Sequence, residues 1–208
     1  EMPVSAMMER ANLALKKTLQ LPQHLKKIGV YDEKEHQKLE REKHLEMRME
    51  QALKNGEFVP YLQPKYELTH ETIAGAEALV RWVSPEEGMI FPGEFIPLFE
   101  KNGFIVELDL YMFEQVCKMI ESWHKNGYRI IPVSVNMSRG HFLVPNFFDR
   151  YKEILERYDV PKGSIEIELT ESLFLNEIST MTDLVNKIHE VGLRCSIDDF
   201  GSGYSSLN

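Results

Sequence analysis

The stretch IEIELTE, residues 165–171, decides the fold because its apolar and acidic side chains alternate strictly. In a strand, its isoleucine and leucine side chains would share one face, and Glu166 and Glu168 would share the other. An isolated strand with this pattern has a solvated polar face. Parallel sheets are covered on both faces, so in a parallel strand the carboxylates instead predict a functional interior.

Similar side chains recur along the chain at intervals close to one βα unit. Asn136 precedes Glu168 by 32 residues, Asp198 follows it by 30, and Glu77 precedes Asn136 by 59. Asn136, Glu168 and the pair Asp198-Asp199 each lie at or just after the end of a short β-branched run, and a strand–helix–strand unit takes about 30 residues. Parallel strands end at one rim of their sheet, where α/β barrels place their chemistry. We therefore predict an α/β fold of the TIM-like (β/α) barrel type.

Composition limits the class of protein and its partners. The 208 residues are 43% hydrophobic and 27% charged, which is typical of a soluble globular chain. The net charge of −9 makes a long nucleic acid a poor partner, whereas a small anion remains possible beside metal ions. No apolar run approaches the ~20 residues of a membrane helix. Cys117 and Cys195 fit buried thiols in a reducing cytoplasm.

The chain divides by composition into three segments. Residues 1–32 contain a helical pattern and a short strand candidate at 28–31, and residues 33–56 form a charged helix that would act as a rigid linker. Residues 57–208 alternate strands with helices, which favours a parallel sheet. The expected strands are 58–66, 73–82, 130–135, 165–169 and 193–197, and the expected helices are 93–101, 106–123, 147–158 and 180–191.

Two features modify this barrel. Pro60 and Pro64 interrupt the first strand and restrict it to an edge or irregular position, because proline donates no hydrogen bond to a ladder. A complete eight-unit barrel takes about 250 residues, and residues 57–208 supply five strands. We therefore expect the barrel to be truncated after about five strands, with the chain a part of a longer protein.

The strand around AEALVRW, residues 76–82, places Glu77, Leu79 and Arg81 on one face by the two-residue period. A carboxylate and a guanidinium that both point inward are costly to bury unless they are paired or bind something. One interpretation is a structural Glu77–Arg81 ion pair. The other assigns Glu77 to a metal ion and Arg81 to a phosphate, which suits the fork geometry of the guanidinium.

The remaining rim residues favour a metal site made of oxygen ligands. Asn136 alone is as well explained by a turn or a helix cap. Asp198 and Asp199, however, are adjacent and repel each other, so both stay ionised only beside cations. Carboxylate and amide oxygens suit Mg²⁺ or Mn²⁺ rather than zinc, and two ions that share a carboxylate suit attack of water on a phosphodiester.

At these residues the chain resembles the EAL domain family. The motifs are EALVRW at 77–82, NMS at 136–138, ELTE at 168–171 and DDFGSGYSSL at 198–207, in order and across residues 57–208. The resemblance implies a Mg²⁺- or Mn²⁺-dependent phosphodiesterase that opens cyclic di-GMP to linear pGpG. It also implies a possible homodimer through the loop that follows Asp199.

The same resemblance assigns roles to individual residues. The first metal ion would be held by Glu77, Asn136, Glu168 and Asp198, with Asp198 bridging to a second ion on Asp199. Glu77, Asp198 and Asp199 would thus be the catalytic set. Cyclic di-GMP would contact Gln63, Leu79 and Arg81, and the loop after Asp199 would be anchored by Glu171.

Two further expectations concern the ends of the chain. Residues 1–32 resemble the last helix and strand of a GGDEF domain, although Asn12 and Lys16 depart from its usual pattern and the cyclase signature is absent. The EAL family also uses a lysine about 20 residues beyond the paired aspartates and a further glutamate, which would both fall after Asn208. We therefore expect the complete parent protein to be the enzyme.

Three alternatives remain open at this point. A catalytically inactive EAL domain would bind cyclic di-GMP as a receptor or act as a protein-interaction module, and the residues beyond Asn208 would discriminate. A barrel glycosidase would use paired carboxylates but explains neither Asn136 nor the adjacent aspartates. A histidine-based cyclic dinucleotide hydrolase is unsupported, because the seven histidines include no pair at metal-ligand helical spacing and no His-Asp dipeptide.

Overall fold

The computed structural model describes residues 3–19, 29–69, 71–170 and 178–198, and the chain divides into two compact units, Glu1–Arg48 and Met49–Asn208. The first unit contains helix α1 (Val4–Leu19) and most of helix α2 (Glu33–Lys54). Arg10 of α1 pairs with Glu33 at the start of α2 (3.2 Å). Residues 29–32 form no strand, so the described part of 28–31 does not bear out the expected strand.

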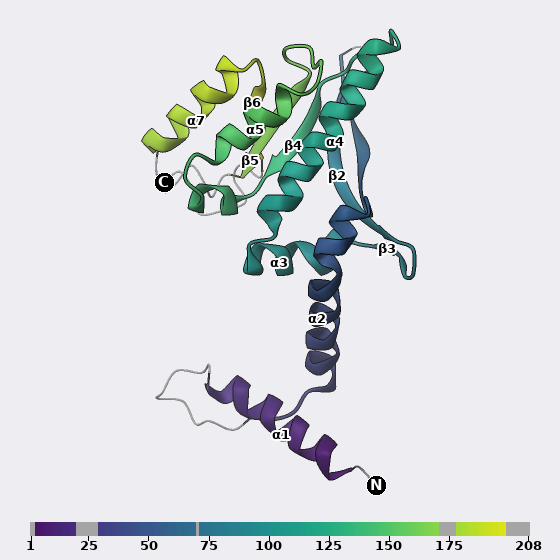
Figure 1. Ribbon diagram of the computed structural model, residues 1–208, viewed down its shortest axis with the longest axis vertical. Helices are drawn as coiled ribbons and strands as arrows, with labels where there is room; N and C mark the ends of the chain where they lie inside the picture. The colour runs from purple at the N-terminus through teal and green to yellow at the C-terminus, as the bar shows by residue number, and fades with distance from the viewer. Residues whose placement is uncertain (1–2, 20–28, 70, 171–177, 199–208) are drawn as a thin grey trace. The chain divides into compact units, whose positions relative to one another are not determined.

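The second unit is built on a six-stranded sheet (Figure 1). The strand order is β1-β2-β4-β5-β6, with β3 paired to β2 outside this path. Four strands are mutually parallel, whereas β1 and β3 each run antiparallel to β2. The strands are β1 (Phe58–Glu67), β2 (Thr72–Ser84), β3 (Gly88–Ile90), β4 (Val133–Met137), β5 (Ile165–Thr170) and β6 (Arg194–Asp198).

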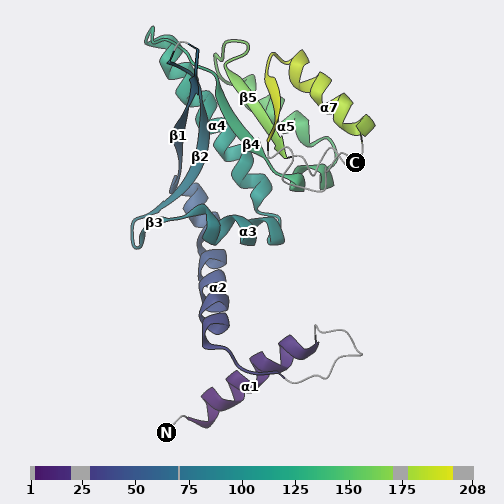
Figure 2. The ribbon, with the colours of Figure 1, turned by 180° about the vertical axis from the view of Figure 1, so that it is seen from behind.

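Helices lie along one face of this sheet. Figures 1 and 2 show α4, α5 and α7 on the same side of the strands, whose other face is turned to the viewer in Figure 2. The helices are α3 (Pro92–Asn102), α4 (Ile105–Lys125), α5 (Phe147–Leu155) and α7 (Ile178–Glu190), with the 3₁₀ helix η1 at Arg139–Leu143. Among the described residues, no helix is long and apolar enough to cross a membrane.

The predicted alternation of β5 is confirmed, and β4 follows the same rule. The apolar side chains of both strands are buried, while Glu166 and Glu168 occupy the opposite face from the isoleucines. This arrangement puts the acidic residues on the face away from the helices. The buried apolar residues of the two strands are Val133, Val135, Met137, Ile165, Ile167 and Leu169.

Most expected elements are present, with shifted boundaries and two additions. The predicted α/β class is confirmed: the sheet is mostly rather than wholly parallel and is consistent with a truncated TIM-like barrel. Strand β1 lies at one end of the strand order, as Pro60 and Pro64 require. The expected strand at 130–135 begins only at Val133. Strand β3 and helix η1 were not predicted, because three to five residues are too few to show a hydrophobic period.

The antiparallel start of the sheet has a local cause. Only residues 68–71 separate β1 from β2, and a connection this short can join only antiparallel strands. Glu71 at the turn has a positive φ of 51°. Alternation of strands and helices predicts a wholly parallel sheet, so it does not predict the antiparallel direction of β1.

Strands β2 and β4 touch over a short length and then separate. Their ladder pairs only Ala76 with Val133 and Glu77 with Ser134, whereas β4 and β5 pair at five positions. Gly75 permits the approach, since a Cβ atom there would lie 2.8 Å from the carbonyl oxygen of Pro132. Beyond Glu77 the sheet therefore opens toward its carboxyl-terminal rim.

Candidate functional site at the carboxyl-terminal rim

The parallel strands bring three of the predicted site residues to one part of the rim. Asn136 of β4 pairs in register with Glu168 of β5, and Glu168 pairs in register with Ser196 of β6. Asp198 ends β6 two positions further on, level with Thr170. The spacing of about one βα unit thus corresponds to neighbouring strand ends, as the sequence predicts.

Glu77 and Asn136 meet across the opening between β2 and β4. The amide nitrogen Nδ2 of Asn136 donates a hydrogen bond to Oε1 of Glu77 at 3.0 Å. Arg81 does not share this bond: it donates to the carbonyl of Val80 at 2.8 Å and lies 5.8 Å from the ring of Tyr61. Among the described contacts Glu77 and Arg81 therefore form no ion pair, so the geometry disfavours the structural alternative.

Glu168 is a nearly buried carboxylate with a cationic neighbour. Its side chain is 8% exposed and forms a salt bridge with the ammonium of Lys65 on β1. Burial lowers the pKa of Lys65, but the hydrogen bond to Glu168 and the charges of Glu168, Glu166 and Glu77 outweigh it and raise the pKa overall. Lys65 is therefore a charged member of this site.

Sequence reasoning missed Lys65, although a signal was present. Gln63 and Lys65 are two residues apart on β1, so they share a face of the strand. Gln63 is directly opposite Glu77 in the antiparallel register, which places that face beside the carboxylates. The missing step was the direction of β1, since only an antiparallel pairing gives this register.

The donor set fits a hard divalent cation. Glu77, Asn136 and Glu168 offer carboxylate and amide oxygens, which are the ligands that such a cation prefers. The charge of the nearly buried Glu168 is already balanced by Lys65. The described residues include no cluster of three His, Cys, Asp or Glu side chains placed to hold a metal ion. The side chain of Asp198, together with Asp199 and Glu171, lies outside the described residues.

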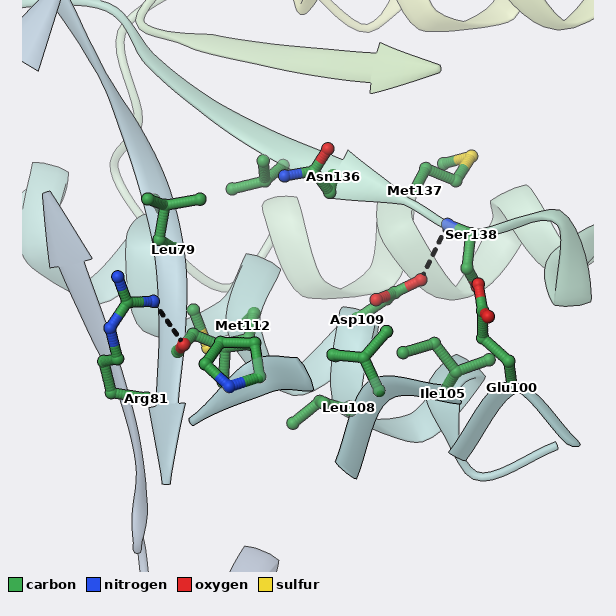
Figure 3. Close-up of a pocket in the computed structure, with 15 residues that line it drawn as sticks. Leu79, Arg81, Glu100, Ile105, Leu108, Asp109, Met112, Asn136, Met137 and Ser138 are labelled. Carbon is green, nitrogen blue, oxygen red and sulfur yellow. Dashed lines mark hydrogen bonds between the residues drawn. The ribbon is translucent and has the colours of Figure 1, made fainter. Parts of the chain in front are cut away.

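A cavity of about 250 Å³ adjoins this rim between the separated strands and helices α3 and α4 (Figure 3). Leu79, Arg81 and Asn136 line it, while Gln63 does not. Its wall also contains a bond that the sequence did not predict, in which the backbone N–H of Ser138 donates to the carboxylate of Asp109 at 2.8 Å. The predicted ligand-contacting residues are thus divided between the cavity and β1.

Comparison with known proteins identifies the family. The EAL domain model matches residues 46–208. The Bacillus subtilis signaling protein YkoW is 34% identical over 163 residues, which are 78% of this chain and 20% of that protein. The Pseudomonas aeruginosa cyclic di-GMP phosphodiesterase NbdA is 33% identical over 163 residues, which are 78% of this chain and 21% of NbdA. The chain therefore spans about a fifth of these relatives.

Solved structures agree with the sequence matches. The MucR phosphodiesterase of Pseudomonas aeruginosa, in complex with c-di-GMP, superposes with a TM-score of 0.72 at 32% identity, covering 79% of this chain and 66% of that one. The EAL domain model covers most of this chain, and the MucR phosphodiesterase shares its fold. This chain therefore belongs to the EAL domain family.

Proposed function

We propose that this EAL domain is part of an enzyme that hydrolyses cyclic di-GMP to linear pGpG with Mg²⁺ or Mn²⁺. The observation that carries the proposal is the meeting of Glu77, Asn136 and Glu168 at one rim of a parallel sheet. Relatives named as cyclic di-GMP phosphodiesterases support the same reaction.

In this proposal Glu77, Asn136, Glu168 and Asp198 would hold the first cation, and Asp198 would share a second one with Asp199. A bound cation of this class polarises a phosphate and lowers the pKa of coordinated water. The residues supply the negative charge and the oxygen donors that hold such an ion. When no cation is bound, the Lys65 ammonium balances the negative charge of Glu168.

Gln63, Leu79 and Arg81 are the proposed contacts for the dinucleotide. Arg81 has no carboxylate partner among the described residues, so its guanidinium is available to a phosphate. Hydrolysis replaces one phosphorus–oxygen ester bond of the ring by a bond to a water oxygen, and the released sugar oxygen takes a proton. The product is the linear dinucleotide.

The contact between Lys65 and Glu168 favours a second candidate function. The Lys65 ammonium, bound to the proposed ligand Glu168, would neutralise part of the acidic rim without a metal ion. A receptor for cyclic di-GMP that lacks a metal ion needs such neutralisation. Such an EAL domain would bind the dinucleotide and leave it intact. Turnover and binding must therefore be measured separately.

Further parts of the proposal concern the whole protein. We place it in the cytoplasm, with residues 1–32 as the end of a GGDEF domain joined by the 33–56 linker. A homodimer would form through the loop after Asp199, anchored by Glu171. Residues 171–177 and 199–208 lie outside the described part of the chain, so the structure does not test this arrangement.

The deciding experiment measures pGpG formation from cyclic di-GMP by the full-length protein. We expect turnover with Mg²⁺ or Mn²⁺, its loss with EDTA and its return when the metal ion is restored. Binding of cyclic di-GMP without turnover under all these conditions would support the receptor instead. Absence of both binding and turnover would contradict both functions.

A further inference from the structure

The end of β4 that carries Asn136 is held unequally on its two sides. Strand β5 pairs with β4 through Met137, but the ladder with β2 stops at Ser134. A strand end with one free side has unsatisfied backbone groups and can shift. Since Asn136 is on this end, something other than β2 has to hold it.

Asp109 of α4 takes the place of the missing strand partner. Its carboxylate oxygen Oδ2 accepts the backbone N–H of Ser138 at 2.8 Å, two residues after Asn136 (Figure 3). The carbonyl oxygen of Ser138 in turn accepts the backbone N–H of His141 at 3.3 Å. Both backbone polar groups of Ser138 are therefore engaged at the point where the strand ends.

Asp109 is itself fixed by a buried histidine. The Nε2 atom of His141 lies 3.1 Å from the same carboxylate oxygen, and His141 is fully buried. Its ring packs between Phe147, at 5.5 Å between centroids, and Tyr151, at 5.3 Å, whose hydroxyl also lies 3.1 Å from Nε2. These distances fit an Nε2–H group that donates to Asp109, with the phenol oxygen as a second neighbour.

Burying this cluster of polar groups costs folding free energy. A carboxylate, an imidazole and a phenol are removed from water together, and the Nδ1 atom of His141 is buried with no hydrogen-bond partner among the described residues. Buried polar groups destabilise a core unless they are hydrogen-bonded, and a hydrogen-bonded network in a core fixes the local geometry. The geometry that this cluster specifies is the path of the chain immediately after Asn136.

We propose that Asp109 and His141 are positioning residues that fix the end of β4, and through it the amide of Asn136, for cation binding. Asp109 acts through the backbone of Ser138, and His141 acts through Asp109. The inference rests on the proposed function in one respect, which is that Asn136 is a metal ligand.

Mn²⁺ binding followed by electron paramagnetic resonance tests this inference without any turnover. We expect Asp109→Ala to weaken Mn²⁺ binding by about 10–100-fold, the usual range when a supporting contact of a metal site is removed. Asn136→Ala removes the proposed ligand itself and should weaken binding at least as much. The double variant should bind nearly as well as Asn136→Ala, because Asp109→Ala acts only through the Asn136 amide. Asp109→Asn, which retains an acceptor for Ser138, should recover most of the affinity.

Glu107→Ala is the matched control. Glu107 lies two residues from Asp109 on the same helix, and its carboxylate binds Arg150 of α5 instead of the strand end. Its loss should change Mn²⁺ affinity by less than about twofold. A well-folded Asp109→Ala variant that binds Mn²⁺ like the wild type would overturn the inference, as would effects of Asp109→Ala and Asn136→Ala that multiply in the double variant.

A measurement on the wild type covers the case in which Asp109→Ala does not fold. Coupling between two sites is reciprocal, so Mn²⁺ binding must slow hydrogen exchange of the Ser138 amide. The slowing should vanish in Asn136→Ala, and an unchanged exchange rate in the wild type contradicts the inference. If the wild type binds no Mn²⁺, the proposed function itself fails. If the wild type binds Mn²⁺ and Asp109→Ala binds it equally well, only the inference about Asp109 fails.

Discussion

At the scale of single residues, Glu77 gives the most direct test of the proposed metal site. Glu77→Ala removes a carboxylate ligand and the acceptor for Asn136, so turnover of cyclic di-GMP should fall by at least about 100-fold. The measurement is pGpG formation at saturating Mg²⁺. Glu86→Ala, in the exposed turn after β2, is the control and should retain full activity. Turnover by Glu77→Ala at the wild-type rate would remove Glu77 from the site.

Arg81 should contribute to ligand affinity rather than to the chemical step. Among the described residues its guanidinium has an aromatic neighbour and a backbone acceptor but no carboxylate, so we expect Arg81→Ala to weaken cyclic di-GMP binding by about 1.5–3 kcal/mol. Titration calorimetry at fixed metal concentration measures this change. Arg129→Ala, in the exposed loop before β4, serves as the control. An unchanged affinity would assign Arg81 a structural role.

At the scale of the elements, an aromatic cluster joins α3 to the first hairpin. Phe95 is fully buried, with ring centroids 5.8 Å from Phe58, 5.8 Å from Trp82 and 5.4 Å from Phe99. Phe95→Ala should lower the free energy of unfolding by about 3–5 kcal/mol in urea denaturation. Phe91→Ala, at a side chain that is 60% exposed, should change it by less than about 0.5 kcal/mol. Equal effects would contradict the role of this cluster.

The contact between α4 and α5 should depend on pH. The hydrogen bonds from Arg150 hold the pKa of Glu107 below its ordinary value, against the opposing effect of burial. A lowered folded-state pKa stabilises the protein above the unfolded pKa, and this stability is lost as pH falls through the folded value. Glu107→Gln should thus be less stable than wild type at neutral pH, by less than about 1 kcal/mol because the pair is half exposed.

Urea unfolding at neutral pH and at successively lower pH checks this dependence on Glu107. The wild type and Glu107→Gln should converge as the pH falls below the lowered pKa of Glu107, because the carboxylate is then protonated in both folded and unfolded chains. Glu156→Gln, at an exposed residue just after α5, provides the comparison for the loss of one surface charge. A difference between wild type and Glu107→Gln that persists in acid would mean that the pair does not cause it.

At the scale of the whole molecule, a cation that binds only the folded state must stabilise it. At 100 times the dissociation constant the stabilisation is about 2.7 kcal/mol, so Mn²⁺ should raise the melting temperature and EDTA should reverse the change. Glu168→Gln should abolish the shift, since it removes a nearly buried ligand charge. An equal shift in Glu168→Gln would place the cation elsewhere.

The sequence predicts the parts of this molecule that repeat along the chain. The period of about one βα unit is enough to bring Asn136 level with Glu168, and two-residue alternation orients Glu168 correctly. The role of Lys65 depends on the antiparallel direction of β1, which a short turn imposes. The contact between Asp109 and Ser138 joins residues 29 apart in sequence through tertiary packing, and no local pattern signals it.

The two prolines of β1 also affect how copies of the chain meet each other. Strand β1 ends the described strand order, and an outermost strand is where a foreign strand can add and start aggregation. Pro60 and Pro64 lie on the same side of the strand and carry no N–H group, so a strand docking there would find two donors missing. In the described strand order, the prolines that favour an end position for β1 therefore also hinder the addition of a foreign strand to it.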